Sequence, residues 1–214
     1  MHKSISNLIS IKSEVENLEK KLEIIAVTKT FPINHILPLI EFGHNHFGEN
    51  KVQEALSKWT EIKIKRPNIQ LHMIGKLQSN KIKHAVKLFD YIHSLDNFKL
   101  ANLLSKYETL FNIKRKYFIQ VNIANEKQKS GIDKNKVALF YKYCTEELNL
   151  NVIGLMCIPP NDGSVNVYFK SIMELNELLG LKELSMGMSA DFMTGIKYKS
   201  TFIRIGSAIF GERS

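Results

Sequence analysis

The chain of 214 residues lacks several features that assign a protein to a class at once. Its two cysteines, Cys144 and Cys157, have neither metal-site spacing nor the number that a disulfide framework needs. No apolar run approaches the roughly 20 residues that cross a bilayer. The N-terminal segment has helical periodicity and carries acids, unlike a signal or transit peptide. We therefore expect a cytoplasmic protein with no membrane partner.

Arginine is also scarce, since only four of the 30 basic residues are arginine. The net charge of +9 comes from lysines spread over nearly every segment, with no arginine-rich stripe or aromatic platform. A Lys-Ile-Asn bias of composition accounts for this excess. We expect no nucleic-acid partner, although a positive field favours a small anionic ligand.

Apolar strand-like runs alternate with amphipathic helical runs after an opening helix. The expected strands are residues 24–28, 44–47, 70–74, 91–94, 117–123, 151–156, 183–186 and 201–205. The expected helices are residues 33–41, 51–63, 79–88, 99–111, 134–148, 165–179 and 190–197. Eight repeats favour a single-domain α/β fold over residues 1–214, a closed TIM-like (β/α)₈ barrel with an extra N-terminal helix. An open flavodoxin-like or Rossmann sheet is the alternative, but no G-x-G-x-x-G motif follows an early strand.

Functional residues of such barrels lie at the C-terminal ends of strands and in the loops that follow. Lys29 follows the first expected strand, where an apolar barrel mouth suits Schiff-base chemistry, although a strand-end lysine is often a solvated side chain. Asn50 follows the second, either at the same rim or as the N-cap of the next helix.

Arg204 lies within the last expected strand, where burial of its charge requires a core carboxylate or a ligand. Gly206 and Ser207 follow it and offer backbone N–H groups and a hydroxyl, the elements of a phosphate-binding loop. Ser189 follows the seventh strand, either as an N-cap of the next helix or in the same loop pair. The phosphate site of these barrels is often built from the loops after strands seven and eight.

The remaining polar strand residues give weaker signals. His44 and His46 share one face of a strand without a third ligand at a telling spacing, so we expect no metal. His72 shares a face with Ile74 and is interpreted as a core histidine. For Asn122, near the end of the fifth strand, contact with a ligand and a bond to neighbouring backbone both stay open.

These positions together describe a site for a phosphate that bears an aldehyde, and pyridoxal 5'-phosphate fits best. Lys29 would form the imine, while Ser189, Gly206 and Ser207 would hold the phosphate. Arg204 would face the pyridine nitrogen, which would leave the ring a weaker electron sink than one paired with a carboxylate.

Nearly the whole chain resembles the pyridoxal phosphate homeostasis proteins (the YggS or PROSC-like family). The motifs that carry the resemblance are AVTK (26–29), FGENKVQE (47–54), HMIGKLQSNK (72–81), QVNI (120–123), KSGI (129–132), GLM (154–156), LSMGMS (184–189) and RIGSAIFG (204–211). The resemblance implies the barrel of alanine racemase, a cofactor bound through Lys29, and the roles given above for Arg204 and the phosphate residues. Ala190 and residues 192–194 depart from the family pattern and are expected behind the phosphate loop.

Two functions follow from this resemblance. The first is a non-enzymatic carrier that buffers pyridoxal phosphate or delivers it to apoenzymes. The second is an enzyme such as an amino-acid racemase, which needs a base on each face of its substrate or one mobile base. The racemase family supplies its second base from an added domain and a partner subunit, and this chain stops at Ser214. We therefore expect a monomeric carrier. A Schiff-base aldolase is disfavoured because its lysine usually comes from a later strand.

Overall fold

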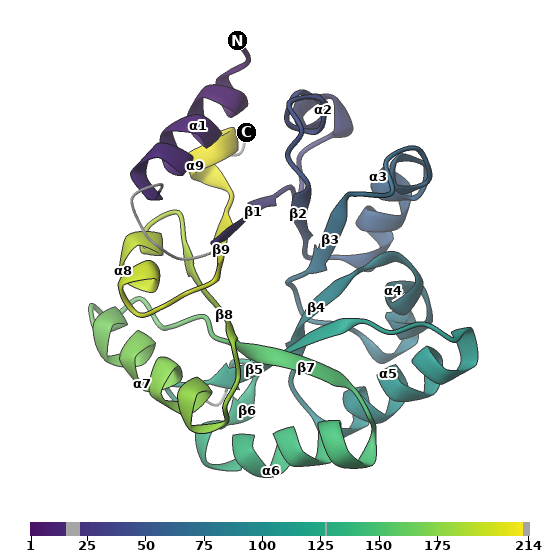
Figure 1. The fold of residues 1–214 in the computed structure, drawn as a ribbon, viewed down its shortest axis with the longest axis vertical. Helices are drawn as coiled ribbons and strands as arrows, with labels where there is room; N and C mark the ends of the chain where they lie inside the picture. Colours follow the sequence, from purple (N-terminus) through teal and green to yellow (C-terminus); the bar gives the residue numbers. More distant parts are fainter. Residues whose placement is uncertain (16–21, 127, 212–214) are drawn as a thin grey trace.

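Eight parallel strands form a closed barrel in the computed structural model, which describes residues 1–15, 22–126 and 128–211 (Figure 1). The strands are β1 (Glu23–Val27), β2 (His46–Glu49), β3 (Gln70–Met73), β4 (Tyr91–Leu95), β5 (Lys116–Asn122), β7 (Asn151–Met156), β8 (Glu183–Met188) and β9 (Phe202–Ile205). They pair in chain order, and β9 pairs with β1 to close the barrel. The predicted (β/α)₈ barrel is confirmed, and the open sheet is wrong.

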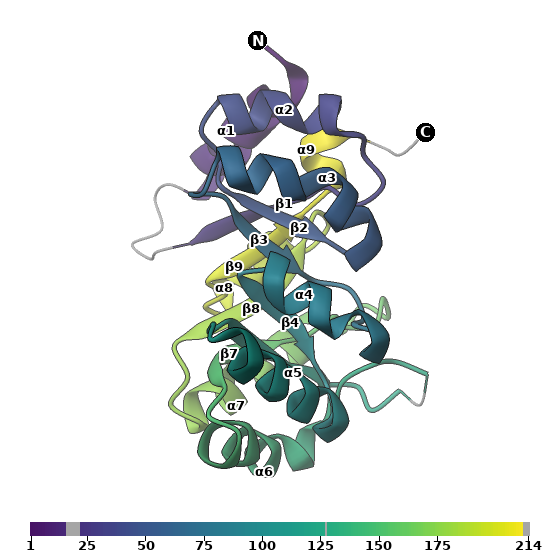
Figure 2. The ribbon, with the colours of Figure 1, turned by 90° about the vertical axis from the view of Figure 1, so that its right-hand side faces the viewer.

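Helices surround the strands on the outside (Figures 1 and 2). They are α1 (Lys3–Val15), α2 (Ile33–Glu41), α3 (Val52–Lys65), α4 (Ile82–Leu88), α5 (Phe98–Phe111), α6 (Val137–Lys142), α7 (Val165–Leu178), α8 (Phe192–Lys197) and α9 (Ser207–Phe210). In Figure 2, α1, α2 and α9 lie at one end of the molecule, and α5, α6 and α7 lie at the other. Among the described residues, no helix is long and apolar enough to cross a membrane.

The sequence placed most elements to within a few residues. The differences include α9, which was not predicted, and a 3₁₀ turn (Ser79–Lys81) that begins the helix predicted over residues 79–88. The second strand begins at His46, two positions later than predicted, because His44 lies in the turn before it. The helix predicted over residues 134–148 is divided into a 3₁₀ turn (Lys134–Lys136), α6 and a wide π turn (Tyr143–Glu147). A two-residue strand, β6 (Ile132–Asp133), pairs with β5 and was not predicted. Residues 16–21 of the predicted opening helix and Arg213 lie outside the described residues.

Successive side chains along each strand point alternately outward to the helices and inward to the barrel, which gives two separate apolar clusters. In β1, Ile24 and Ala26 pack outward against the helices, whereas Ile25 points into the barrel. In β9, Ile203 and Ile205 face outward, and Phe202 joins Ile25 in the interior cluster with Tyr91, Phe118 and Met156. Because Arg204 follows the same alternation and pairs in register with Ile25, it also points into the barrel.

The first and last helices of the described chain pack against each other. The side-chain amide of Asn7 in α1 donates a hydrogen bond to the carbonyl of Ile209 in α9, at 2.9 Å. The contact covers the outside of the seam where β9 closes on β1 (Figure 1). Because β1 pairs with β9, the segments that follow these strands and carry Lys29 and Ser207 lie next to each other although they are far apart in the sequence.

Candidate functional site

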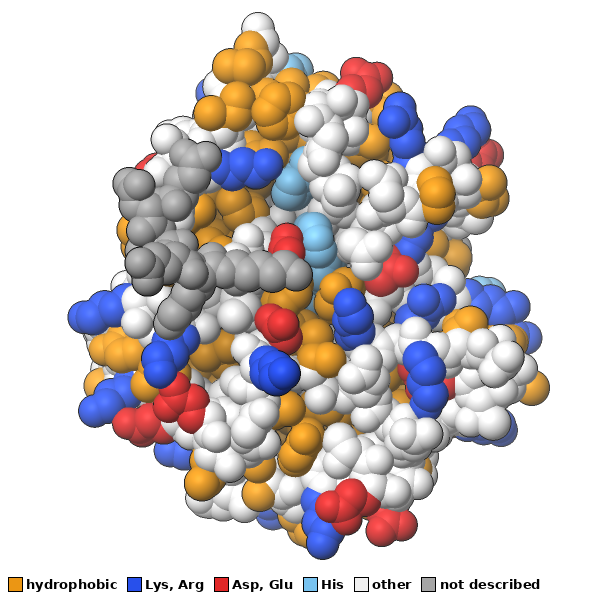
Figure 3. Space-filling view, viewed as in Figure 1, with side chains coloured by type: hydrophobic (Ala, Val, Ile, Leu, Met, Phe, Trp, Pro, Cys, Tyr) orange, Lys and Arg blue, Asp and Glu red, His pale blue; other side chains and the backbone are white. Residues whose placement is uncertain are grey.

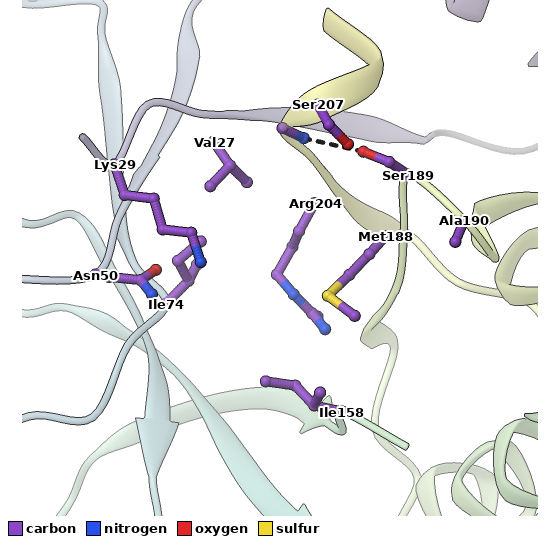
Figure 4. Close-up of a pocket in the computed structure, with 11 residues that line it drawn as sticks. Val27, Lys29, Asn50, Ile74, Ile158, Met188, Ser189, Ala190, Arg204 and Ser207 are labelled. Carbon is purple, nitrogen blue, oxygen red and sulfur yellow. Dashed lines mark hydrogen bonds between the residues drawn. The ribbon is translucent and has the colours of Figure 1, made fainter. Parts of the chain in front are cut away.

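A cavity of about 510 Å³ lies at the C-terminal end of the barrel (Figure 4). It is lined by Val27, Lys29, Asn50, Ile74, Ile158, Met188, Ser189, Ala190, Arg204, Gly206 and Ser207. All six residues predicted for the site are in this set. The volume falls within the range of about 300–1,000 Å³ that is common for small-molecule sites.

Lys29 extends into the cavity from the turn that follows β1 (Figure 4). This turn is fixed from α3 by Lys58, whose ammonium donates to the carbonyls of Thr28 at 2.8 Å and Phe31 at 3.0 Å. The N–H of Thr30, which has a φ of 69°, donates to the carboxylate of Glu54 at 2.6 Å. The backbone on both sides of Lys29 is therefore anchored, while its side chain reaches the cavity.

A buried carboxylate supports the same turn. Glu49 is fully buried, and its Oε1 accepts hydrogen bonds from the hydroxyl of Thr28 at 2.7 Å and the indole N–H of Trp59 at 2.9 Å. The same oxygen forms an ion pair with Lys58 at 2.8 Å. Glu49 therefore supports the turn that carries Lys29 through Thr28 and Lys58, and it does not line the cavity.

Arg204 projects into the cavity opposite Lys29 (Figure 4). Its guanidinium donates to the carbonyl of Ser185 at 2.8 Å, the hydroxyl of Ser185 at 2.7 Å and the carbonyl of Cys157 at 3.0 Å. No carboxylate among the described residues forms an ion pair with it, so the core ion pair considered from the sequence is wrong. Burial lowers the pKa of Arg204 from its ordinary value, because the charged form loses hydration.

The loops after β8 and β9 meet at a third side of the cavity. The hydroxyl oxygen of Ser189 accepts hydrogen bonds from the N–H groups of Gly206 and Ala208, each at 3.3 Å. Two backbone donors thus converge on one oxygen atom, an arrangement that also suits an oxygen of a bound anion. Ser189 was considered as the N-cap of the helix after β8, but that position belongs to Asp191, and Ser189 instead bonds the start of α9.

Asn50 lines the cavity beside Lys29 and is not an N-cap, because Lys51 occupies that position before α3. A Cβ on Gly75 would lie 2.4 Å from the carbonyl oxygen of Asn50, so only glycine lets the loop after β3 pass this close. Asn122 bonds the backbone of Glu126 through both ends of its amide and does not line the cavity.

Gly187 shapes the loop that carries Ser189. Its φ is +92°, and an added Cβ would lie 2.9 Å from the Cα of Phe192. We expect Gly187→Ala to lower the free energy of unfolding by more than the roughly 1–2 kcal/mol cost of placing alanine in a left-handed conformation. Urea unfolding measures this loss. Gly180→Ala is the control, because Gly180 has a φ of +67° but open space around it. Equal losses in the two variants would contradict the close contact at Gly187.

The charges around the cavity have one sign. Lys29 and Arg204 are its two cationic residues, and none of the described lining residues is acidic. The larger apolar side chains of the lining, Ile74, Ile158 and Met188, were not assigned to the site from the sequence, because they lie at or just after the ends of three separate strands with no shared motif. Ala190 was expected behind the phosphate loop but lines the cavity, since the turn after β8 brings it to the surface of the pocket.

The histidines do not form a metal site. Among the described residues, no three His, Cys, Asp or Glu side chains gather as a metal ion would require. His44 bonds the carbonyl of His46 at 2.9 Å. His72 is fully buried and bonded at both ring nitrogens, so its interpretation as a core histidine is confirmed.

Comparison with known proteins places the chain in a family. The family model of the alanine racemase N-terminal domain matches residues 6–214. The pyridoxal phosphate homeostasis protein of Aquifex aeolicus is 36% identical over 204 residues, which cover 91% of this chain and 89% of that protein. The protein of the same name from Vibrio cholerae is 35% identical over 224 residues, covering 97% and 95%. The chain belongs to the pyridoxal phosphate homeostasis protein family.

A solved structure of this family supports the same assignment. PipY from Synechococcus elongatus PCC7942, with pyridoxal phosphate bound, superposes with a TM-score of 0.88 at 32% identity. The match covers 97% of this chain and 100% of PipY. The resemblance to the family and to the racemase barrel, predicted from motifs, is therefore confirmed.

Proposed function

We propose that this chain binds pyridoxal phosphate in the cavity at the C-terminal end of the barrel and acts as a carrier of the cofactor. One observation carries the proposal: an amine, a guanidinium and converging backbone N–H groups surround one pocket that has no acidic residue among its described lining. This set matches an anionic phosphate that also bears an aldehyde. Relatives of this chain are named for pyridoxal phosphate homeostasis, and PipY has been solved with the cofactor.

The proposed roles follow from the position of each side chain. Lys29 would hold the cofactor through its Nζ, at the aldehyde. Ser189, Gly206 and Ser207 hold the phosphate, with Ser207 presenting an N–H group at the first position of α9. Arg204 would donate to the ring nitrogen, and the amide of Asn50 bounds the pocket beside Lys29. When bound, the cofactor supplies an electrophilic carbon and an electron-withdrawing ring.

The proposed carrier does not turn over amino acids catalytically. Racemisation or decarboxylation requires groups that exchange a proton with the substrate carbon. Among the described residues that line the cavity there is no histidine, tyrosine, cysteine or carboxylate, so Lys29 has no second base to work with on the opposite face of a substrate. A racemase would exchange the α-proton of an amino acid for deuterium in heavy water, which proton NMR detects. Exchange above that of free pyridoxal phosphate would contradict the carrier proposal and favour the racemase alternative.

Borohydride reduction tests the lysine assignment. After incubation with pyridoxal phosphate and reduction, we expect peptide mass mapping to locate one adduct on Lys29. Lys29→Ala should lose this adduct and the visible absorption that accompanies it. Lys51→Ala is the matched control, since Lys51 is exposed next to Asn50 but does not line the cavity. Labelling scattered over surface lysines, or an adduct that survives in Lys29→Ala, would contradict the proposal.

A further inference from the structure

A chain of polar side chains runs through the interior of the barrel and ends at the proposed cofactor site. Its members, in spatial order, are Glu23, His46, His72, His93, Ser185 and Arg204. Glu23 and His46 are the first residues of β1 and β2, so they lie at the end of the barrel opposite the cavity. The roles assigned to the pocket use only the last member.

The part of this chain near the cavity is completely buried. The guanidinium of Arg204 donates to the hydroxyl of Ser185 at 2.7 Å, and this hydroxyl lies 2.9 Å from Nδ1 of His93. Nε2 of His93 lies 2.9 Å from Nδ1 of His72. Ser185, His93 and His72 are fully buried. Each of these polar atoms therefore depends on its neighbour in the chain.

The other end reaches the surface. Nε2 of His72 lies 3.0 Å from Nδ1 of His46, and Nε2 of His46 lies 3.3 Å from the carboxylate of Glu23. The side chains of His46 and Glu23 are 17% and 28% exposed. In Figure 3, histidine and acidic side chains lie side by side near the middle of one face of the molecule. Solvent protons can therefore reach this end of the chain.

The two inner histidines are neutral. Burial holds the pKa of His72 well below its usual value, and the charges of neighbouring histidines act in the same direction. Burial, together with the charge of Arg204, does the same for the pKa of His93. A neutral imidazole has one N–H donor and one acceptor nitrogen, so each ring passes on the direction of hydrogen bonding that it receives.

The two ends of the chain determine that direction when His46 is neutral. Arginine can only donate, and an ionised carboxylate can only accept. The carboxylate of Glu23, 3.3 Å away, favours a hydrogen on Nε2 of neutral His46. Its Nδ1 must then accept from His72, which must therefore carry its hydrogen on Nε2. By the same argument His93 carries its hydrogen on Nε2, and the hydroxyl of Ser185 donates to His93. In each of the four hydrogen bonds between Arg204 and His46, the donor then lies on the Arg204 side, and the hydrogen of His46 points toward Glu23.

Protonation of His46 reverses this arrangement. A charged imidazole donates from both nitrogens, so Nδ1 of His46 would donate to His72. His72 and His93 each keep one hydrogen, but it must move from Nε2 to Nδ1 to avoid two opposed donors. Ser185 then accepts hydrogens from both His93 and Arg204, and its own hydroxyl hydrogen must turn to another acceptor. The added proton comes from solvent and stays on His46.

We propose that Ser185, His93, His72 and His46 form a hydrogen-bond relay that positions Arg204 and transmits the protonation of His46 to the cofactor site. The relay makes Ser185 and His93 positioning residues for Arg204. It gives the cavity a dependence on pH that originates at the opposite end of the barrel. Its operation does not require the cofactor, so it can be tested independently of the proposed function.

Titratable and charged groups on several described elements face the relay. They are Glu23 of β1, His44 before β2, Lys63 of α3, Tyr91 of β4 and, near Arg204, Cys157 and Asp191. Burial raises the pKa of the Cys157 thiol to about 12, so it stays neutral beside Arg204. The carboxylate of Glu23 lies 3.3 Å from a ring nitrogen of His46, whereas the other groups act through their charge or through ring contacts.

Nitrogen NMR of the cofactor-free protein tests the relay directly. With histidine labelled at both ring nitrogens, we expect His72 and His93 to carry hydrogen on Nε2 at about pH 8. Between about pH 8 and pH 5, both hydrogens should move to Nδ1 with the midpoint at which His46 gains its proton. The side-chain N–H resonances of Arg204 should shift with the same midpoint. Tautomers that stay fixed while His46 titrates would overturn the proposal.

Two controls distinguish a relay from a merely structural cluster. His44 is an internal reference, because a carbonyl fixes its Nε2 as a donor and burial lowers its pKa to about 4. Its tautomer should not change over the same range. His46→Gln removes the titrating ring at the partly exposed end, and His72 and His93 should then keep one tautomer at every pH. Switching that persists in His46→Gln would show that His46 does not drive it.

Discussion

Lys58→Met is expected to lower the free energy of unfolding by about 3–5 kcal/mol, the cost of leaving a buried charge without its partner. Glu49 is fully buried and forms an ion pair with Lys58, whose side chain is 10% exposed. The variant also removes the donor to the carbonyls of Thr28 and Phe31, on the two sides of Lys29. Urea unfolding measures the loss, and weaker adduct formation at Lys29 should accompany it.

A double variant separates the buried charge from simple loss of packing. Glu49→Gln keeps the oxygen that accepts from Thr28 and Trp59 but removes the charge. We therefore expect Lys58→Met combined with Glu49→Gln to be more stable than Lys58→Met alone. Additive losses would show that the two residues are not coupled. Lys170→Met breaks an exposed pair with Glu174 and should cost no more than about 1 kcal/mol.

Arg204→Met is expected to weaken pyridoxal phosphate binding about tenfold to a hundredfold, which corresponds to roughly 1.5–3 kcal/mol for a charged hydrogen bond. Without cofactor, the stability should stay within about 1 kcal/mol of the parent protein. Loss of bonds to Ser185 and Cys157 is offset by removal of a buried cation that has no ion-pair partner among the described residues. Absorbance titration and urea unfolding measure the two effects.

Arg115→Met is the matched control for this variant. Arg115 donates to the carbonyl of Val86 and does not line the cavity, so cofactor affinity should be unchanged. Parent-like affinity in Arg204→Met would show that Arg204 does not contact the cofactor. A loss of stability as large as that expected for Lys58→Met would show that its contacts to Ser185 and Cys157 hold the barrel together.

The sequence predicted the barrel and the six lining residues for a shared physical reason. Alternating strand and helix patterns imply a parallel barrel, and a parallel barrel brings the ends of its strands to one mouth. Lys29, Asn50, Ser189 and Arg204 could therefore be brought together without knowing any contact between them. Their roles toward the cofactor remain predictions that the proposed experiments test.

Contacts that depend on strand register could not be predicted in this way. His46, His72 and His93 lie on three different strands, and only the register brings their ring nitrogens within hydrogen-bond distance. Nothing local in the sequence shows that Glu49 meets Lys58 and Trp59 in the interior. Ser189 bonds α9 rather than the helix that follows it, which a local capping rule does not anticipate.

The closure of β9 on β1 has a consequence for how the protein acquires its ligand. Lys29 comes from the beginning of the barrel, whereas Arg204, Gly206 and Ser207 come from its last strand and helix. A ribosome-bound chain therefore has the amine but not its counterpart until almost all of the barrel has been synthesised. The pocket is complete only when the last strand has joined the first, and a ligand that bridges the two sides stabilises the closed barrel by mass action. Only a chain in which β9 has closed on β1 therefore presents both sides of the pocket to a ligand.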